Sequence, residues 1–236
     1  MLILTIETAT PVERVAVVRD GNVLAELTDT VGRGHTEKLL GAVEDVLGRS
    51  GEALADLDAV AVSIGPGRFS GLRVGLATAK GLSAASGVPV VPVPTLDALA
   101  ESARPFRGLV CPALDARRGE VYAALFRMRE VSEGAAGGAP EAARERLLPD
   151  SAVPPAELAA NVLAAAGGED VLFLGSGAFE YVEELRSAMG GAFVRPDDAV
   201  RQPTPAAMAA IVGLDPAGLP GASEARTLEP VYLRGI

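Results

Sequence analysis

The feature that most restricts the fold of this chain is an internal repeat. The segments "SIGPGRF" and "FLGSGAF" both place Gly-x-Gly-x-Phe between an expected strand and an expected helix. Gly175 lies 110 residues after Gly65, and Asp115, at the end of another expected strand, lies 108 residues after Glu7. Short glycine motifs also recur by chance, but the matching order and offset favour duplication of one α/β unit.

The spacing of apolar residues predicts the same order of elements in both halves. The first half is expected to hold strands at 2–6, 14–20 and 22–28, a helix at 36–47, a strand at 59–64, a glycine-rich helix ending near 86, a strand at 88–93 and a helix from 95. The second half is expected to hold strands at 108–115 and 120–128, a helix at 156–166, a strand at 170–175 and a helix at 178–189. We therefore predict an N-terminal lobe, 1–104, and a C-terminal lobe, 105–236.

Two stretches are predicted to be poorly ordered because they are rich in glycine, alanine and polar residues. The first is a mobile surface loop near 130–146, within "SEGAAGGAPEAARER". The second is "GLDPAGLPGASEA", at the start of the tail 213–236. Neither stretch carries a recognisable motif.

Composition excludes several classes of function. The chain has 236 residues, of which 49% are hydrophobic, so it can bury a full core. Its net charge of −10 and its scattered basic residues argue against direct binding of RNA. Cys111 is the only cysteine, which excludes an internal disulfide and a cysteine-rich zinc site. No apolar run is long enough to span a membrane, and we expect a cytoplasmic protein.

The stretch "GPGRFSGLRVGLATAKGL", Gly65 to Leu82, joins a glycine-rich loop to a helix. A phosphate-binding P-loop needs a second glycine five positions on, followed by Lys and Ser or Thr, and neither Gly65 nor Gly67 has that continuation. The dinucleotide fingerprint fails as well, because Ser70 occupies its last glycine position. The loop is therefore predicted to be a tight turn.

The helix of this stretch contains glycines that need an explanation. Gly75 and Gly81 each cost about 1 kcal/mol of helix propensity relative to alanine. A ridge of small residues, with leucines at its edges, would let another helix approach closely. That helix could belong to a partner or to the same domain, and the residues alone leave both possibilities open. The ridge is formed by Gly71, Gly75, Ala79 and Ser83, and its edges by Leu72, Leu76 and Leu82.

Five motifs together resemble the TsaB (YeaZ) family: "ILTIETAT", "HTEKLL", "GPGRFSGLRVGLATAKGL", "DARRGEVYAALF" and "PVYLR". The resemblance implies a two-lobed α/β fold of the actin-like, sugar-kinase and Hsp70 ATPase type, which is ribonuclease H-like, with a duplicated βββαβα unit. It also implies an accessory, non-catalytic role in making threonylcarbamoyladenosine in transfer RNA. In that family the transferase is a paralogous subunit of the same fold, and a small ATPase assists it.

The resemblance further implies which surface binds partners. In the family, the helix at 36–47 and the glycine-rich helix form a helical bundle with the partner, so this chain would be a homodimer alone and a heterodimer with the transferase paralogue. Transfer RNA would be bound only indirectly. The expected partner-binding residues are His35, Leu39, Leu40, Val43, Leu47, Gly71, Leu72, Gly75, Leu76, Ala79 and Ser83.

Metal-dependent and nucleophilic catalysis are not expected. The catalytic paralogue holds its metal partly with two histidines one helical turn apart, whereas here His35 is followed four residues later by Leu39. Because the chain has no other histidine, it cannot form a His-x-x-x-His site and is not expected to be a metalloprotease. A helix-cap or surface position is the simpler interpretation of His35. Cys111 lies in an apolar strand and is predicted to be a core residue.

Binding of ATP or ADP with Mg²⁺ is a secondary hypothesis. Enzymes of this fold place an acidic residue after the first strand, a position that Glu7 and Thr8 occupy in the first half and Asp115 in the second. Asp115 could instead pair with Arg117 or Arg118. The alternative function is therefore a stand-alone ATP-dependent kinase or carbamoyl-transfer enzyme. Its further nucleotide contacts would be Gly175, Ser176 and Gly177.

Overall fold

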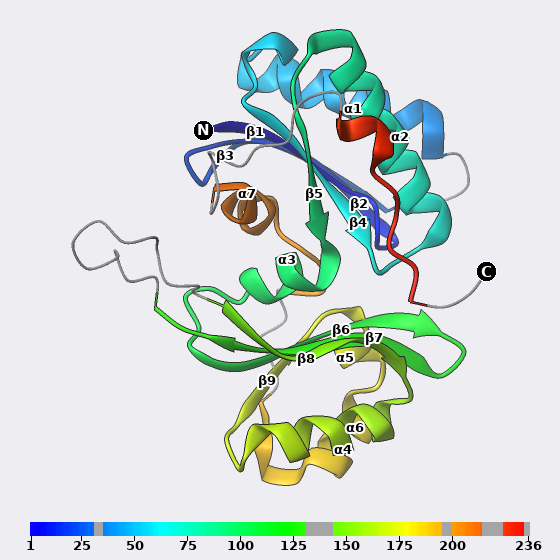
Figure 1. The fold of residues 1–236 in the computed structure, drawn as a ribbon, viewed down its shortest axis with the longest axis vertical. Helices are drawn as coiled ribbons and strands as arrows, with labels where there is room; N and C mark the ends of the chain where they lie inside the picture. The colour runs from blue at the N-terminus through cyan, green and yellow to red at the C-terminus, as the bar shows by residue number, and fades with distance from the viewer. Residues whose placement is uncertain (31–34, 131–143, 195–199, 214–223, 234–236) are drawn as a thin grey trace. The chain divides into compact units, whose positions relative to one another are not determined.

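The computed structural model describes residues 1–30, 35–130, 144–194, 200–213 and 224–233, with the side chains of residues 30 and 35–37 left out. The chain forms two compact units (Figure 1). The first contains Met1–Glu101 and Pro203–Tyr232, and the second contains Ser102–Gln202. The predicted lobe 105–236 therefore needs correction, because Pro203–Tyr232 belongs to the first unit.

The sheet of the first unit has the order β3-β2-β1-β4-β5. Its strands are β1 (Leu2–Glu7), β2 (Val12–Arg19), β3 (Asn22–Thr30), β4 (Ala59–Gly65) and β5 (Val90–Pro94). The first three strands form an antiparallel meander, and β4 and β5 continue the sheet in parallel. The predicted turn between β2 and β3 is confirmed: Asp20 and Gly21 both have positive φ, as a tight hairpin requires.

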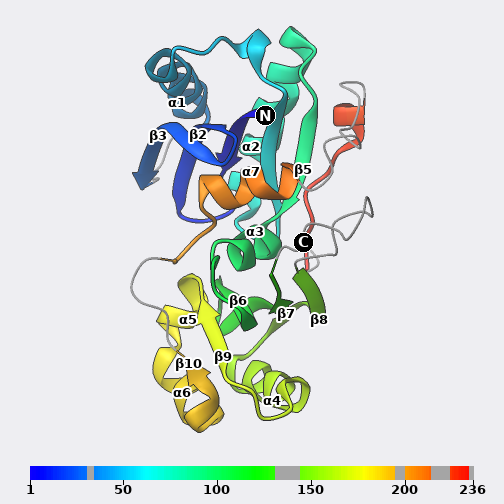
Figure 2. The ribbon, with the colours of Figure 1, turned by 90° about the vertical axis from the view of Figure 1, so that its left-hand side faces the viewer.

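Helices cover both faces of this sheet (Figure 2). One face of the strands packs on α1 (His35–Ser50) and α2 (Phe69–Ser86) through residues such as Leu4, Val60 and Leu76. The other face packs on α3 (Thr95–Glu101) and α7 (Pro205–Gly213), with Met208 and Val212 in that core. This burial of α7 explains why the chain after residue 203 belongs to the first unit.

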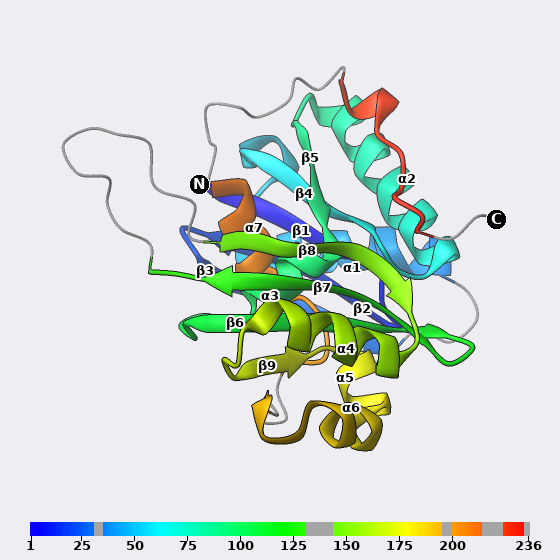
Figure 3. The ribbon, with the colours of Figure 1, turned by 60° about the horizontal axis from the view of Figure 1, so that its bottom comes forward.

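The second unit repeats this plan with the sheet order β10-β9-β6-β7-β8. Its strands are β6 (Gly108–Arg117), β7 (Glu120–Met128), β8 (Arg144–Val153), β9 (Val171–Leu174) and β10 (Phe193–Val194). Figure 3 shows α4 (Pro155–Ala166) and α6 (Val182–Met189) on one face of the sheet, where Leu158 and Leu185 reach the core. The helix predicted at 178–189 is divided at Tyr181 into α5 (Ser176–Glu180) and α6.

The two predicted poorly ordered stretches fall largely outside the described residues, which omit 131–143 and 214–223. Their described ends are regular. Residues 144–146 begin β8, and residues 224–227 form a short 3-10 helix, η5 (Glu224–Thr227).

The two Gly-x-Gly turns share their geometry, which supports the duplication. The first glycine of each motif has a positive φ, 114° at Gly65 and 98° at Gly175. The second glycine of each lies against the backbone near the C-terminal end of the first strand of its unit. A Cβ added to Gly67 would lie 2.5 Å from the Ala9 carbonyl oxygen, and one on Gly177 would lie 2.8 Å from the carbonyl carbon of Leu114. The two units have the predicted α/β fold class with a duplicated βββαβα arrangement.

Candidate functional site

The small-residue ridge of α2 packs inside its own unit. A Cβ at Gly71 would overlap the carbonyl oxygen of Thr8, and one at Gly75 would overlap the Thr8 hydroxyl. These glycines therefore form a notch into which the chain after β1 fits. The prediction that this ridge meets a partner needs correction, because all of its members and their flanking leucines are buried within the unit: Gly71, Leu72, Gly75, Leu76, Ala79, Leu82 and Ser83.

The residues predicted on α1 divide between core and surface. Leu39 and Val43 are buried in the core of the unit, and Leu47 packs against it. Leu40 is 48% exposed and is the one residue of this set with a large exposed side chain. The side chain of His35 lies outside the described residues. Helical periodicity therefore marked the core face of α1 rather than its outward face.

The outward face of α2 carries a second row of small residues that the sequence argument missed. Ala77, Gly81 and Ala85 are exposed and follow one another at intervals of four residues. A Cβ added to Gly81 would meet no atom of the described residues within 4 Å. Packing within the described part of the chain thus does not explain the helix-propensity cost of Gly81, unlike that of Gly75. In the sequence, the helix-propensity cost of Gly81 and the four-residue spacing of Ala77, Gly81 and Ala85 were the signals that could have indicated this row.

The adjacent helix α1 has a similar outward face. Gly41 and Gly48 are exposed, and an added Cβ at either would also meet nothing within 4 Å. Leu40 stands beside them as an exposed apolar side chain. Another helix could approach the outward faces of α1 and α2 closely and make apolar contact at one edge. We call the residues of these faces the outward helix face: Leu40, Gly41, Ala77, Gly81 and Ala85.

Glu7 is buried rather than presented to a ligand. Its side chain is 1% exposed, one carboxylate oxygen accepts a hydrogen bond from the Ala9 amide at 2.7 Å, and the other has no hydrogen-bond partner among the described residues. Burial raises the pKa of Glu7 to about 7, and the Ser63 hydroxyl, the backbone amides of Ala9 and Thr10 and the charge of Arg14 oppose that rise only in part. About half of the Glu7 side chains are therefore uncharged near neutral pH.

The residues that follow Glu7 also make their polar contacts within the unit. Thr8 donates its amide hydrogen to Ser63 Oγ at 3.2 Å, and its hydroxyl faces the Gly75 notch. Arg68 donates its amide hydrogen to the Ala9 carbonyl at 2.8 Å. An ATP phosphate with Mg²⁺ needs charged oxygens and free amides that it can reach, so Glu7 and Thr8 in this arrangement do not fit that ligand.

The nucleotide contacts predicted in the second unit are also engaged internally. The Asp115 carboxylate pairs with Arg117 at 3.1 Å, one of the two interpretations left open by the sequence. Asp115 donates its amide hydrogen to Ser176 Oγ at 3.1 Å, and Gly175 donates its amide hydrogen to the Val200 carbonyl at 2.9 Å. The structure thus brings the predicted nucleotide contacts together, but they form a packed turn rather than an open binding site. These residues are Asp115, Gly175, Ser176 and Gly177.

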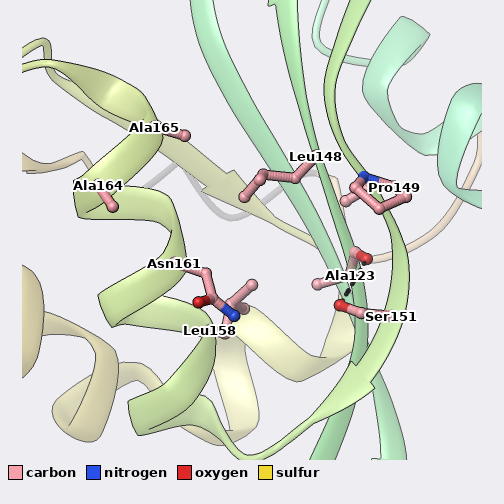
Figure 4. Close-up of a pocket in the computed structure, with 9 residues that line it drawn as sticks. Ala123, Leu148, Pro149, Ser151, Leu158, Asn161, Ala164 and Ala165 are labelled. Carbon is pink, nitrogen blue, oxygen red and sulfur yellow. Dashed lines mark hydrogen bonds between the residues drawn. The ribbon is translucent and has the colours of Figure 1, made fainter.

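A cavity of about 440 Å³ lies elsewhere in the second unit, between α4 and the strands β7 and β8 (Figure 4). Among its lining groups, the Ser151 hydroxyl donates a side-chain hydrogen bond to the Ala123 carbonyl at 3.4 Å. None of the predicted site residues lines it. Its lining has no titratable group, and consists of Ala123, Ala124, Leu148, Pro149, Ser151, Leu158, Asn161, Ala164 and Ala165.

Three further observations concern other kinds of site. Cys111 is fully buried, and burial raises the pKa of its thiol, as expected for a core residue. Within the described ranges, no three His, Cys, Asp or Glu side chains are grouped so that they could hold a metal ion. None of the helices in that part of the chain has the length and apolar character needed to cross a bilayer.

Comparison with known proteins places these features in a family. Residues 23–213 match the model of the family described as TsaD, tRNA N6-adenosine threonylcarbamoyltransferase. The chain is 41% identical over 132 residues to the tRNA threonylcarbamoyladenosine biosynthesis protein TsaB of Escherichia coli strain K12, covering 55% of this chain and 57% of that protein. It is 35% identical over 129 residues to TsaB of Bacillus subtilis strain 168, covering 55% and 56%. The matched part thus spans somewhat more than half the length of these curated relatives.

A solved structure extends the similarity over the whole chain. YeaZ from Pseudomonas aeruginosa superimposes on this chain with a TM-score of 0.76 at 29% sequence identity. The superposition covers 98% of this chain and 99% of the YeaZ chain.

Proposed function

Because this chain belongs to the TsaD family, and within it to the TsaB (YeaZ) proteins, we propose that it serves threonylcarbamoyladenosine synthesis in the cytoplasm as a non-catalytic partner subunit. It dimerises with the paralogous threonylcarbamoyltransferase through the outward helix face, and with itself when that subunit is absent. The small ATPase of the same system acts on the assembled complex.

The observation that carries this proposal is the outward helix face. Gly81 and Gly41 leave open space at the surface of two adjacent helices, and Leu40 adds exposed apolar area. A glycine inside an exposed helix costs about 1 kcal/mol and gains no contact from the described residues here, so close approach by a partner helix supplies its reason. The net charge of −10 further supports transfer RNA being held by other subunits.

The interface is tested by replacing Gly81 with leucine. The side chain fits the isolated chain, because the space beyond Gly81 is open, but it would hold a partner helix away. We expect dissociation constants at least about tenfold higher for the homodimer and the heterodimer, which corresponds to about 1.4 kcal/mol. Sedimentation velocity measures the first, and titration with the purified transferase paralogue measures the second.

A matched control is Ala160→Leu, which places the same side chain on the exposed part of α4 in the second unit. It should leave both associations unchanged. Wild-type association of Gly81→Leu with both partners would refute the proposed interface. Gly75 is unsuitable for this experiment because its substitution disturbs packing against Thr8.

The alternative, a stand-alone ATP-dependent enzyme, makes a different prediction. We expect calorimetry with ATP and Mg²⁺ on the isolated chain to show no saturable binding in the low micromolar range. The physical reason is that Glu7 is buried and half-protonated near pH 7, while Ser176 and the Gly175 amide are already hydrogen-bonded. Tight binding with turnover that Glu7→Ala abolishes would favour the enzyme instead.

A further inference from the structure

The cavity between α4 and the strands β7 and β8 of the second unit has a buried floor and an open mouth (Figure 4). The floor consists of Ala123 and Ala124 of β7 and Leu158 of α4, all of which are buried. At the mouth lie exposed residues from both walls, Pro149 of β8 and Asn161 of α4. The cavity is thus open to solvent on one side, while its floor belongs to the core of the unit.

An irregularity in the pairing of β7 with β8 lies beside this cavity. Ala123 pairs with Ser151, and Leu125 pairs with Leu148, so one residue of β7 faces two residues of β8 between these pairs. One of the two is Pro149, which has no amide hydrogen to donate. A bulge of this kind bends its strand, and bulges are over-represented next to active sites. The strand wall of the cavity is therefore irregular and poor in hydrogen-bond donors.

Alanines occupy the walls of the cavity at positions where larger apolar side chains would fill it. Four of them contribute to the lining: Ala164 and Ala165 on α4, and Ala123 and Ala124 on β7. Protein interiors have few gaps larger than a water molecule, and atoms that line a gap lose dispersion contacts. The volume of about 440 Å³ lies within the range of small-molecule sites, about 300–1,000 Å³. An apolar occupant of that size class would restore the missing contacts.

Two polar side chains of the lining define what such an occupant must offer. The Ser151 hydroxyl already donates its hydrogen to the Ala123 carbonyl at 3.4 Å, so toward a ligand it acts as an acceptor. The Asn161 side chain extends from α4 toward the strands in Figure 4, and its amide has no hydrogen-bond partner among the described residues. This amide both donates and accepts. A carboxamide carries the matching groups, a carbonyl that accepts and N–H groups that donate.

The lining disfavours charged ligands. None of the described residues that line the cavity is titratable, so a carboxylate or an ammonium group bound there would have no charged partner. Burial of an unpaired charge is costly. Water is also held weakly where few polar groups are available, and an apolar group that displaces poorly ordered water gains affinity. The chemistry of the lining therefore favours an uncharged molecule that is mostly apolar.

We propose that this cavity binds an uncharged, largely apolar small molecule that has a planar ring system and one carboxamide group. The rings lie in the space between the helix α4 and the sheet, against the alanines of both walls. The carboxamide lies at the mouth, where it pairs with Asn161 and Ser151. The site belongs to the second unit and shares no residue with the outward helix face, so it is independent of the proposed subunit interface.

The test uses naphthamide, an uncharged molecule with two fused rings and one carboxamide, as the probe for the full chain. Amide chemical shifts in nuclear magnetic resonance spectra are expected to change saturably at Ser151 and Ala164, with a dissociation constant below about 1 mM. Naphthoate has the same rings but carries a carboxylate, and we expect it to bind at least about tenfold more weakly.

Two variants locate the probe. Ala165→Leu fills the space and should raise the dissociation constant at least about tenfold, whereas Ala160→Leu, on the exposed part of the same helix and outside the lining, should leave it unchanged. Asn161→Ala removes only the amide at the mouth and should raise it about fivefold. Because Asn161 is exposed, this variant is expected to fold normally and keeps the test informative even if Ala165→Leu disturbs packing.

Several results would overturn the proposed site. Absence of saturable shifts at Ser151 in the wild type would show that the cavity does not bind this class of molecule. Wild-type affinity in both Ala165→Leu and Asn161→Ala would place the probe elsewhere on the chain. Equal affinity for naphthoate would contradict the exclusion of charge. Loss of naphthamide binding when the transferase paralogue is added would mean that a protein covers the cavity. None of these results bears on Gly81→Leu, which tests the interface in the first unit.

Discussion

Replacing Gly71 with alanine is expected to lower the free energy of unfolding by about 2 kcal/mol, although alanine is the better helix former. The new methyl group would overlap the Thr8 carbonyl oxygen, which is a backbone atom and cannot rotate away. Overpacking of this kind costs about 1–3 kcal/mol, and here the chain after β1 must also move. The gain in helix propensity, about 1 kcal/mol, offsets only part of that cost. Urea denaturation followed by far-ultraviolet circular dichroism measures the change, since the chain has no tryptophan.

The control lies on the same helix. Gly81→Ala adds the same methyl group where nothing stands within 4 Å, so it should raise the free energy of unfolding by up to about 1 kcal/mol. The two substitutions are thus expected to have opposite signs. If Gly71→Ala also stabilised the chain, the packing of α2 on Thr8 would be wrong.

These two glycines show what the sequence could reveal about α2. Its spacing of small residues correctly predicted a close approach by another element. It could not identify that element, because Gly71 and Gly75 receive Thr8 from the same unit, whereas Gly81 faces open space. The spacing of small residues on a helix describes the helix surface alone and does not identify the element that packs against it.

The elements that the sequence missed lack a clear periodic pattern. Strand β8 lies at the sheet edge, contains Arg144, Glu145, Arg146 and Pro149, and has no fully buried residue, so its alternation is weak. Helix α7 has the opposite character, since its sequence "PAAMAAIVG" is apolar on every side. The repeated Gly-x-Gly turns were predictable because a positive φ strongly favours glycine at Gly65 and Gly175.

The candidate nucleotide residues show a different limit. Glu7 is the last residue of β1 and Asp115 lies within β6, whereas the sequence placed both after the first strand of their repeat. Asp115 does lie beside Ser176. Their accessibility depends on what the rest of the chain places over them. In the first unit, Gly67 and Gly71 allow α2 and its preceding loop to close over residues 8 and 9. That closure leaves Glu7 without solvent, which sequence position does not disclose.

Replacing Glu7 with glutamine is expected to remove a large pH dependence from the stability of the chain. Burial raises the pKa of Glu7 from 4.5 to about 7 in the folded state. Below pH 4.5 the carboxyl is protonated in both states, so the folded state has no penalty. Between pH 4.5 and 7 the unfolded chain loses this proton while the folded chain retains it. Stability therefore falls by about 1.4 kcal/mol per pH unit across that window, for a total of about 3 kcal/mol, and levels off above it.

Glutamine keeps the oxygen that accepts the Ala9 hydrogen bond but cannot ionise. The difference in unfolding free energy between Glu7→Gln and the wild type should grow in favour of the variant by about 3 kcal/mol between pH 4.5 and 7.5. Other titrating groups, including Glu13, whose pKa burial also raises, cancel in this difference because both proteins contain them. Urea denaturation at several pH values supplies the measurement. A constant difference across the range would mean that Glu7 is accessible to solvent in the folded chain, and would reopen it as a ligand for a bound nucleotide.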